Sequence, residues 1–273
     1  MFRAHSSKSN PPKPLIIAHR GASFVAPENT LAAFARAFDD GADGIELDVW
    51  LARDGVPVVI HDATLRRTGR RKGQVSQMSS QELSEADIGS WFNQAHRKRS
   101  ASEYAQQTVP TLDQVFQLTK NVSKPASPPV LYIELKTDGT SDGRELAQAV
   151  INLVDKHGLR NQVVIISFDL NTVAIIEQTD ATVRTGALFA PETSTSSILG
   201  SRRRVALAVD CGAKEILLHR LLTTQRAVET ALETGLDTVV WTVDHPAWVH
   251  RAKAWGIRAL ITNNPARLKT TTG

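Results

Sequence analysis

The sequence predicts an α/β fold: a TIM-type (β/α)8 barrel that is somewhat irregular and carries a small insertion after its third strand. Short apolar runs alternate with helical patterns along nearly the whole chain, which is typical of βαβ units around a parallel sheet. Charged residues and histidines follow several of these runs, as in barrels whose functional side chains come from the ends of several strands. Because the chain has no GxGxxG turn and no P-loop, an open doubly wound sheet is disfavoured.

The expected strands number nine, one more than a barrel of eight strands needs. They are residues 15–20, 44–50, 57–61, 130–136, 163–168, 183–189, 215–219, 238–243 and 257–262. The link between Asp48 and His61 is too short for a helical crossover, which takes about a dozen residues or more. Either one strand therefore lies outside the barrel, or the second and third strands join irregularly.

Four segments between the strands have recognisable helix ends. They are residues 30–39, 144–157, 224–234 and 246–255. Each is followed closely by a glycine, which suits the left-handed position just past a helix. Pro246 suits the first helical turn, where its missing N–H has no helical partner.

The chain divides into a leader, a barrel and an insertion. Residues 1–13 are polar and proline-rich and are expected to be flexible, and residues 14–273 form a single domain. Residues 62–109 interrupt the alternation with a polar segment, and loops of this length are usually functional or disordered. Since the segment follows His61 directly, we interpret it as an insertion near the barrel mouth; a tolerated surface excursion is the alternative.

The bulk composition bounds the class of protein. With 273 residues, of which 41% are hydrophobic, the chain can bury a sizeable core. The net charge of +4 is concentrated in basic clusters: Arg66 to Lys72, Arg97 to Arg99, and Arg202 to Arg204. We interpret these clusters as solvated surface, with phosphate steering as the alternative. Nucleic acid is not an expected partner, because aromatic residues interleave poorly with them.

The single cysteine, Cys211, excludes a disulfide framework and favours a reducing compartment. We expect it to be a small core residue in a helical stretch. No apolar run reaches the roughly 18 residues of a membrane span, so no stable membrane insertion is expected. The sequence favours a cytoplasmic protein, although removal of a signal segment would leave the same sequence; it predicts no oligomeric state.

Carboxylates alternate with apolar residues on two expected strands. In IELDV, Glu46 and Asp48 face one way and the apolar residues the other, and in YIELK Glu134 and Lys136 share a face. A strand-end salt bridge would explain any one of these acids. Because burying an uncompensated carboxylate costs several kcal/mol or more, the three acids together indicate a cation site. Three oxygen ligands suit a hard divalent cation, Mg²⁺ or Ca²⁺.

Two histidines stand at neighbouring strand ends, His19 in AHRGAS and His61 in VVIHD. A hard cation beside two imidazoles and the cations Arg20 and Lys136 is what phosphoryl transfer requires. Phosphate charge is neutralised, one imidazole accepts a proton from the nucleophile and the other donates one to the leaving oxygen.

These motifs resemble those of the glycerophosphodiester phosphodiesterase family. HRGAS, APENT, GADGIELDV, DGVPVVIHD, YIELK, SF at 167–168 and WTVD at 241–244 occur in the family's order, and TLRRT, GSWF and VPTLDQV in the insertion are also similar. The resemblance runs from about residue 15 to residue 268. It implies a TIM barrel that hydrolyses a small-molecule glycerophosphodiester to an alcohol and sn-glycerol 3-phosphate with a divalent metal.

The resemblance also implies a role for each site residue. His19 and His61 correspond to the catalytic pair, Arg20 and Lys136 to the phosphate-binding cations, and Phe168 and Trp241 to apolar walls for the glycerol carbons. Glu46, Asp48 and Glu134 correspond to the metal ligands. A core role for Phe168 remains the alternative, and the glycerol 2-hydroxyl rather than water is a possible first nucleophile. Hydrolysis of lysophospholipids or another bulkier diester, and a non-catalytic phosphodiester-binding barrel, are the competing functions.

The resemblance is incomplete near the C-terminus. Where the family often has Asp before Pro in a TDxP turn, this chain has Asn263 and Asn264 in ITNNP. WTVD replaces the commoner WTVN, so that Asp244 stands in place of an amide. We expect neither change to touch the groups that bind metal or transfer protons, and therefore expect an effect on substrate preference rather than on activity.

Overall fold

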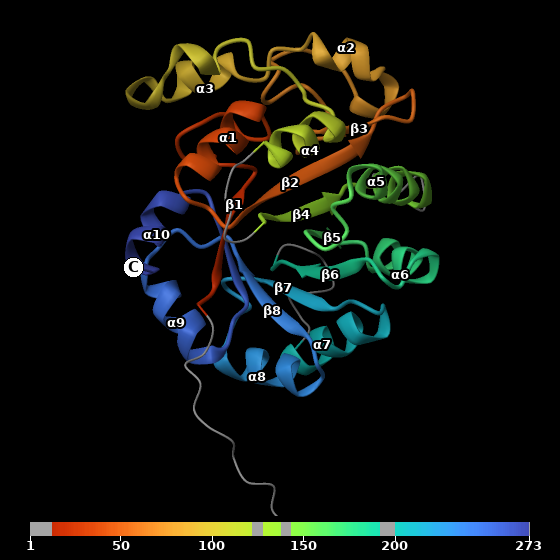
Figure 1. Cartoon of the computed structure of the whole chain (residues 1–273), viewed down its shortest axis with the longest axis vertical. Coiled ribbons are helices and arrows are strands. Elements are labelled where there is room, and N and C mark those ends of the chain that lie inside the picture. Colours follow the sequence, from red (N-terminus) through yellow and green to blue (C-terminus); the bar gives the residue numbers. More distant parts are fainter. Residues whose placement is uncertain (1–12, 122–127, 138–142, 192–199, 273) are drawn as a thin grey trace, which may run out of the picture.

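A computed structural model describes residues 13–121, 128–137, 143–191 and 200–272. Nine strands form one sheet in the order β1-β9-β8-β7-β6-β5-β4-β2-β3, and β1 also pairs with β2, which closes the sheet into a barrel. The barrel strands all pair in parallel. They are β1 (Leu15–His19), β2 (Gly44–Leu51), β4 (Val130–Leu135), β5 (Val163–Ser167), β6 (Arg184–Phe189), β7 (Glu215–His219), β8 (Asp237–Trp241) and β9 (Ala259–Thr262). The predicted TIM barrel is confirmed (Figure 1).

The ninth strand lies outside the barrel. Among the strands of the sheet, β3 (Pro57–Val59) pairs with β2, antiparallel, with Val49 opposite Val59, and Val58 forms an isolated bridge with Thr111. Because antiparallel neighbours need only a short turn, the short link between Asp48 and His61 is a hairpin connection and not a crossover. It also returns the chain to the end of β2, where the backbone N–H of Ile60 donates to the carbonyl oxygen of Asp48 at 3.0 Å.

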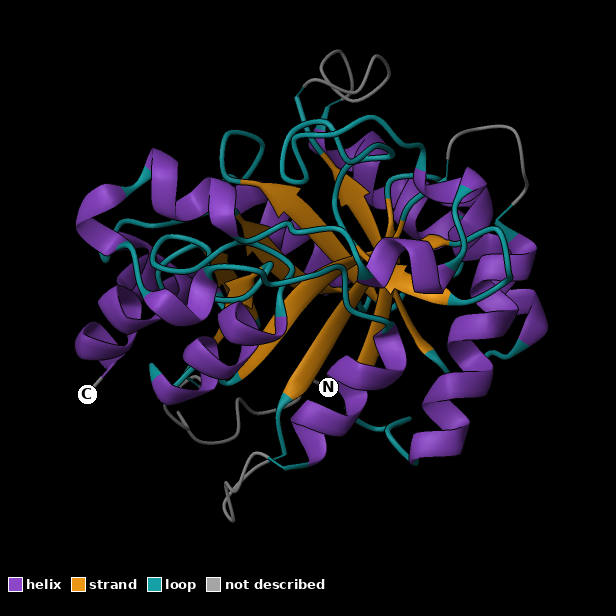
Figure 2. Ribbon diagram, turned by 90° about the horizontal axis from the view of Figure 1, so that it is seen from above, coloured by secondary structure: helices purple, strands orange, loops and turns teal. Residues whose placement is uncertain are grey.

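Helices surround the strands, as Figure 2 shows. They are α1 (Leu31–Asp39), α4 (Leu112–Lys120), α5 (Arg144–His157), α6 (Leu170–Thr179), α7 (Ser201–Asp210), α8 (Gln225–Glu233), α9 (Ala247–Trp255) and α10 (Pro265–Thr272). The four predicted helices correspond to α1, α5, α8 and α9. Gly158 and Gly256 end two of them in the left-handed conformation, as expected.

Residues 62–109 form short elements with a small core of their own. They are η1 (Val75–Gln77), α2 (Ser80–Ser84), α3 (Ser90–Ala95), η2 (Arg97–Arg99) and η3 (Ser102–Tyr104). Leu65 and Leu83 are fully buried in a cluster that includes residues of β3, while Phe92 packs near Ala26 and Ala33. The segment is thus a packed part of the chain that lies against β3 and the β1–α1 connection.

The apolar faces of the strands pack against the helices. Ile45, Leu47 and Val49 are completely buried in one cluster with residues of α1 and α4, so Glu46 and Asp48 face the barrel interior, as predicted. Cys211 is also a core residue, as expected, although it is the residue that ends α7 rather than part of a longer helical stretch.

A second buried charge cluster lies at the opposite end of the barrel, where the strands begin. The fully buried carboxylate of Glu215 accepts a hydrogen bond from the Tyr132 hydroxyl at 2.8 Å and from Arg184 at 2.5 Å, and Arg258 lies 3.3 Å away. Burial raises the pKa of Glu215, while the two arginines act against that shift. We assign this cluster to stability, because the functional side chains of TIM barrels come from the opposite, C-terminal ends of the strands.

Glu215→Ala is expected to destabilise the fold by about 3 kcal/mol, because it leaves Arg184 and Tyr132 without their buried partner. Urea unfolding of the two proteins measures the loss. Glu215→Gln keeps an acceptor for the tyrosine hydroxyl and should lose less. An alanine variant as stable as the wild type would show that the cluster contributes nothing to folding.

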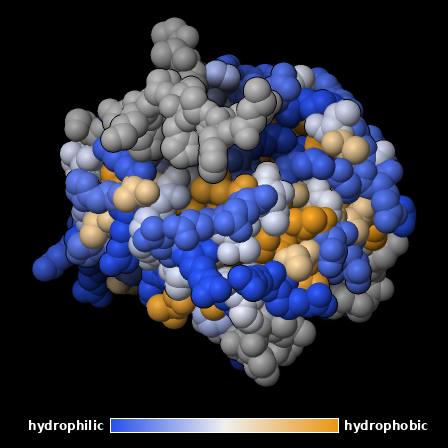
Figure 3. Space-filling model, turned by 90° about the horizontal axis from the view of Figure 1, so that it is seen from below, coloured by the Kyte–Doolittle hydropathy of each residue, from blue (hydrophilic) through white to orange (hydrophobic). Residues whose placement is uncertain are grey.

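Among the described residues no helix is long and apolar enough to cross a bilayer. Figure 3 shows one face of the molecule, on which the hydrophobic side chains form separate areas bordered by hydrophilic side chains.

Candidate active site

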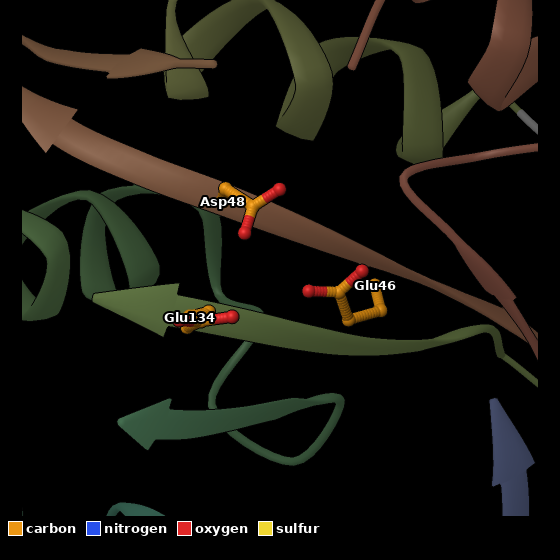
Figure 4. A group of neighbouring side chains, drawn as sticks. All are labelled: Glu46, Asp48 and Glu134. Atoms are coloured by element: carbon orange, nitrogen blue, oxygen red, sulfur yellow. The ribbon is translucent and has the colours of Figure 1, made fainter. Parts of the chain in front are cut away.

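Three carboxylates converge inside the barrel mouth. Glu46 and Asp48 come from β2 and Glu134 from β4, where the register places Asp48 beside Glu134. One oxygen of each lies within 4.8 Å of the others, and all three residues are buried. Figure 4 shows the carboxylates turned toward the same space between the two strands. The alternation that sets both acids of β2 on one face therefore produces the predicted cluster.

Two cations partly balance these acids. Arg20 Nε lies 3.2 Å from Asp48 Oδ2, and Lys136 Nζ lies 3.0 Å from Asp48 Oδ1. Lys136 Nζ also donates to Glu134 Oε1 at 2.5 Å. Asp48 is thus held between both cations, whereas Glu46 accepts a hydrogen bond from the backbone N–H of Arg20, at 3.0 Å.

The pKa values reflect this unequal pairing. Burial acts to raise the pKa of Asp48, but Lys136 and Arg20 outweigh it and hold the pKa well below its usual range. Burial, then Asp48 and Glu134, raise the pKa of Glu46 well above its usual range. Burial also raises the pKa of Glu134 to about 7, against the pull of Lys136. Two cations are therefore too few to keep all three buried acids ionised, so the pKa values of Glu46 and Glu134 stay raised.

This cluster fits a divalent cation. All its donors are oxygen atoms, which hard cations such as Mg²⁺ and Ca²⁺ prefer. Asp48 Oδ1 is buried and accepts no hydrogen bond of normal geometry, and its ion pair with Lys136 Nζ at 3.0 Å leaves this carboxylate oxygen a second lone pair for a metal. An added positive charge would also favour the ionised forms of Glu46 and Glu134.

A sharp turn after β1 presents His19 and Arg20 to the cluster. Arg20 has φ +56° and Gly21 has φ +80°, both in the left-handed region. A side chain on Gly21 would meet the backbone of Ala33 at 2.6 Å, so only glycine allows α1 to pack this closely against the turn. This explains the HRG sequence physically.

His19 is oriented by an amide. Its Nδ1 lies 2.7 Å from Asn263 Oδ1, and its Nε2 lies 3.9 Å from Glu46 Oε2. Because the amide oxygen can only accept, Nδ1 carries the proton and Nε2 presents its lone pair to the cluster. Burial and the neighbouring Arg20 lower the pKa of His19 to about 4, so its imidazole is neutral.

Asn263 is itself fixed by Asp244. The Asn263 side-chain amide donates to Asp244 Oδ2 at 2.9 Å, and its backbone N–H donates to Asp244 Oδ1 at 2.8 Å. The expectation that neither change touches the proposed site is therefore wrong for Asn263, which contacts His19, whereas Asp244 reaches His19 only through Asn263. β8 and β9 are neighbours in the barrel, and their pairing brings the two loop residues together beside His19.

His61 is oriented by a carboxylate. Its Nδ1 donates to Asp62 Oδ1 at 2.6 Å, and Arg67 binds both oxygens of Asp62. Burial lowers the pKa of His61, Asp48 opposes that shift and Arg20 adds to it. The two histidines thus stand beside one acid cluster with different partners.

The APENT motif supplies two further contacts that were not predicted. Asn29 donates to Asp48 Oδ2 at 2.7 Å, and Glu28 accepts from Arg20 at 3.0 Å. Glu28 also accepts two hydrogen bonds from Arg67, both at 2.8 Å. The position of APENT two residues after HRGAS was the signal that could have assigned them to the site.

A small hollow of about 50 Å³ adjoins the cluster. Phe168 and Trp241 line it together with His19, Glu46 and Glu134, and the two aromatic rings meet edge to face with centroids 5.5 Å apart. Both aromatic side chains are only partly buried. Six of the nine residues predicted for the site line this hollow: His19, Arg20, Glu46, Glu134, Phe168 and Trp241. Asp48 and Lys136 contact each other in the adjoining acid cluster, and His61 interacts electrostatically with Asp48.

Comparisons with known proteins agree with this geometry. Residues 19–267 match the model of the glycerophosphoryl diester phosphodiesterase family. A glycerophosphodiester phosphodiesterase of Bacillus subtilis is 31% identical, over 95% of this chain and 88% of that protein. The glycerophosphodiester phosphodiesterase structure from Agrobacterium tumefaciens is 28% identical, with a TM-score of 0.73 over 94% of this chain and 99% of that one.

A third similarity concerns the fold. An Oleispira antarctica phosphodiesterase, solved in complex with its product sn-glycerol-3-phosphate, has a TM-score of 0.80 and 24% identity over 95% of this chain and 96% of that one. The family match extends over most of the sequence and includes both strands that carry the acids. The chain belongs to the glycerophosphoryl diester phosphodiesterase family.

Proposed function

We propose that this enzyme hydrolyses glycerophosphodiesters to an alcohol and sn-glycerol 3-phosphate. The observation that carries the proposal is the cluster of three buried acids with two cations, next to two histidines, in a chain of this family. A small hollow lined by His19, Glu46 and Glu134 adjoins this cluster. We propose Glu46, Asp48 and Glu134 as ligands of Mg²⁺ or Ca²⁺, and Arg20 and Lys136 as contacts to the phosphate oxygens. When bound, the metal ion would neutralise phosphate charge and help to orient the diester.

The proton transfers follow from the partners of the histidines. With Nε2 unprotonated and an amide on Nδ1, His19 is placed to accept the proton of the attacking hydroxyl, whether from water or from the glycerol 2-hydroxyl. Asp62 opposes the lowering of the His61 pKa by burial, and His61 in its protonated form would donate to the alcohol oxygen as the P–O bond breaks. Phe168 and Trp241 would hold the glycerol carbons and keep water from that side.

Asn263→Ala is expected to lower kcat by about 10- to 100-fold, because residues that orient a functional histidine typically contribute that much. Steady-state kinetics on a glycerophosphodiester measure the loss. KM should change little, since Asn263 contacts His19 rather than the substrate. Equal kcat in the two proteins would exclude a positioning role.

The double variant Asn263→Asp with Asp244→Asn is the matched control. It exchanges the amide and the carboxylate but keeps one of each, so it should retain more activity than Asn263→Asp alone, which sets two carboxylates against each other. In the double variant the acidic limb of the pH profile of kcat should also move to higher pH, because a carboxylate beside Nδ1 favours the imidazolium and raises the pKa of His19. A purely structural role for Asn263 would leave that profile unchanged.

Release of sn-glycerol 3-phosphate from a panel of glycerophosphodiesters tests the function. The expected products are sn-glycerol 3-phosphate and the free alcohol in equal amounts. Turnover confined to lysophospholipids would favour the bulkier substrate, and tight binding without turnover would favour a non-catalytic barrel. We also propose a cytoplasmic location, because the only cysteine is a buried thiol, which suits a reducing compartment.

A further inference from the structure

A basic loop, residues 64–74, follows His61 and has a defined conformation. Thr64 and Gln74 pair at its base, the Leu65 N–H donates to the Gly73 carbonyl at 3.0 Å, and the Val75 N–H donates to the Ala63 carbonyl at 2.9 Å. Leu65 is completely buried beneath the loop. The loop is therefore closed at its base and anchored by an apolar side chain.

Four cations of this basic loop line one hollow of about 550 Å³. They are Arg66, Arg70, Arg71 and Lys72, and all four are exposed. Arg70 donates to the Gln94 amide, a neutral group. Within the part of the chain that the structure describes, no carboxylate forms an ion pair with any of the four, although Arg67 between them pairs with Glu28 and Asp62.

This unbalanced charge favours an anion in the hollow. Like charges gathered on one short loop repel one another and raise the local positive potential. Guanidinium groups bind phosphate through paired, directional hydrogen bonds, and a lysine adds a mobile point charge. A phosphate or another compact anion would satisfy the cluster better than water does.

The basic loop is joined to the active site through Arg67. Arg67 binds Glu28, and Glu28 accepts a hydrogen bond from Arg20, which contacts Asp48. Arg67 also binds Asp62, the partner of His61. The aromatic pair Phe168 and Trp241 comes from β5 and β8, on the other side of the mouth from β1 and β2. A diester with its glycerol against that pair and its phosphate at Arg20 would direct its alcohol group toward the His61 side of the mouth, where the basic loop begins.

We propose that the basic loop is a subsite for a second anionic group, a phosphomonoester in particular, carried by the alcohol part of the substrate. The proposal rests on the proposed function, because it places the alcohol relative to that site. It names a substrate class: glycerophosphodiesters whose alcohol is itself phosphorylated.

The test compares glycerophosphoglycerol with the same compound bearing a terminal phosphate. The ratio of the two kcat/KM values is measured for the wild type, for the triple variant Arg66→Gln, Arg71→Gln and Lys72→Gln, and for a control. The control, Lys120→Gln with Lys253→Gln, removes cations near the C-terminal ends of α4 and α9, away from the strand ends that form the mouth.

We expect the triple variant to lower the ratio, phosphorylated over unphosphorylated, at least about fivefold, since a single exposed ion pair contributes up to about that factor. The control variant should keep the wild-type ratio. High salt should also lower the wild-type ratio, because the screening length shortens from about 10 Å at 0.1 M to about 3 Å at 1 M.

Equal ratios in the wild type and the triple variant would overturn the subsite. Binding to phosphatidic acid vesicles that is lost in the triple variant, with no change in the ratio, would assign the loop to a lipid surface instead and equally overturn it. If neither diester is hydrolysed, the proposed function fails by itself. Calorimetric binding of the phosphorylated diester to the wild type and the triple variant then still decides the subsite, and equal affinities would refute it.

Discussion

Replacing His19 or His61 with alanine is expected to lower kcat by about 100- to 10,000-fold with the fold intact, because general acid or base catalysis typically contributes that much. The two imidazoles stand beside the same acid cluster, one on Asn263 and one on Asp62. The double variant should lose far less than the product of the single losses, since residues that act as a unit are not additive. Steady-state kinetics on metal-loaded protein measure all three.

His250→Ala is the control, because this exposed histidine of α9 lies outside the site. A nitrophenyl diester has a leaving group that needs no proton, so it should rescue His61→Ala more than His19→Ala. Equal rescue would refute the division into acid and base. Near wild-type kcat in either single variant on a natural diester would remove that histidine from the mechanism.

Glu46→Gln and Asp48→Asn are each expected to weaken Mg²⁺ or Ca²⁺ binding at least about tenfold. Residues that merely orient a metal ligand already contribute about 10- to 100-fold, and these two substitutions remove ligand charge directly. Calorimetric titration of the ion into metal-free protein measures the affinity, and circular dichroism checks that each variant is folded.

Glu215→Gln makes the same chemical change in a buried glutamate at the opposite end of the barrel, beside Arg184 and Tyr132. It should leave the affinity for the ion unchanged. If all three variants bound the ion as the wild type does, the acids of β2 would not be its ligands.

The fold was largely predictable because its signals are local. A short apolar run placed β7 at its observed bounds, and the glycine after the helix did the same for the end of α5. The sequence left open where the extra strand goes, since a three-residue strand such as β3 has no pattern that distinguishes a barrel strand from a hairpin arm. Only its pairing with β2 decides that.

The candidate site was predictable where the alternation of apolar and acidic residues along a strand coincides with a motif of the family. Glu46 and Asp48 are two residues apart on one strand, so their shared face follows from strand geometry alone. Asn263 and Asp244 could not be assigned that way, because their contact with each other and with His19 spans the closure of the barrel from β9 to β1. The two departures from the family pattern, at positions 244 and 263, are far apart in the sequence, but the side chains of these two residues are hydrogen-bonded to each other in the structure.

The central claim is that the acid cluster and the two histidines form a metal-dependent phosphodiesterase. It is tested most directly by measuring sn-glycerol 3-phosphate released from glycerophosphocholine, glycerophosphoethanolamine and glycerophosphoglycerol by metal-stripped protein, before and after Mg²⁺ or Ca²⁺ is returned. We predict no release from the stripped protein and full release once one of the two ions is restored. Undiminished release from rigorously metal-free protein, or none from any diester with either ion present, would contradict this account.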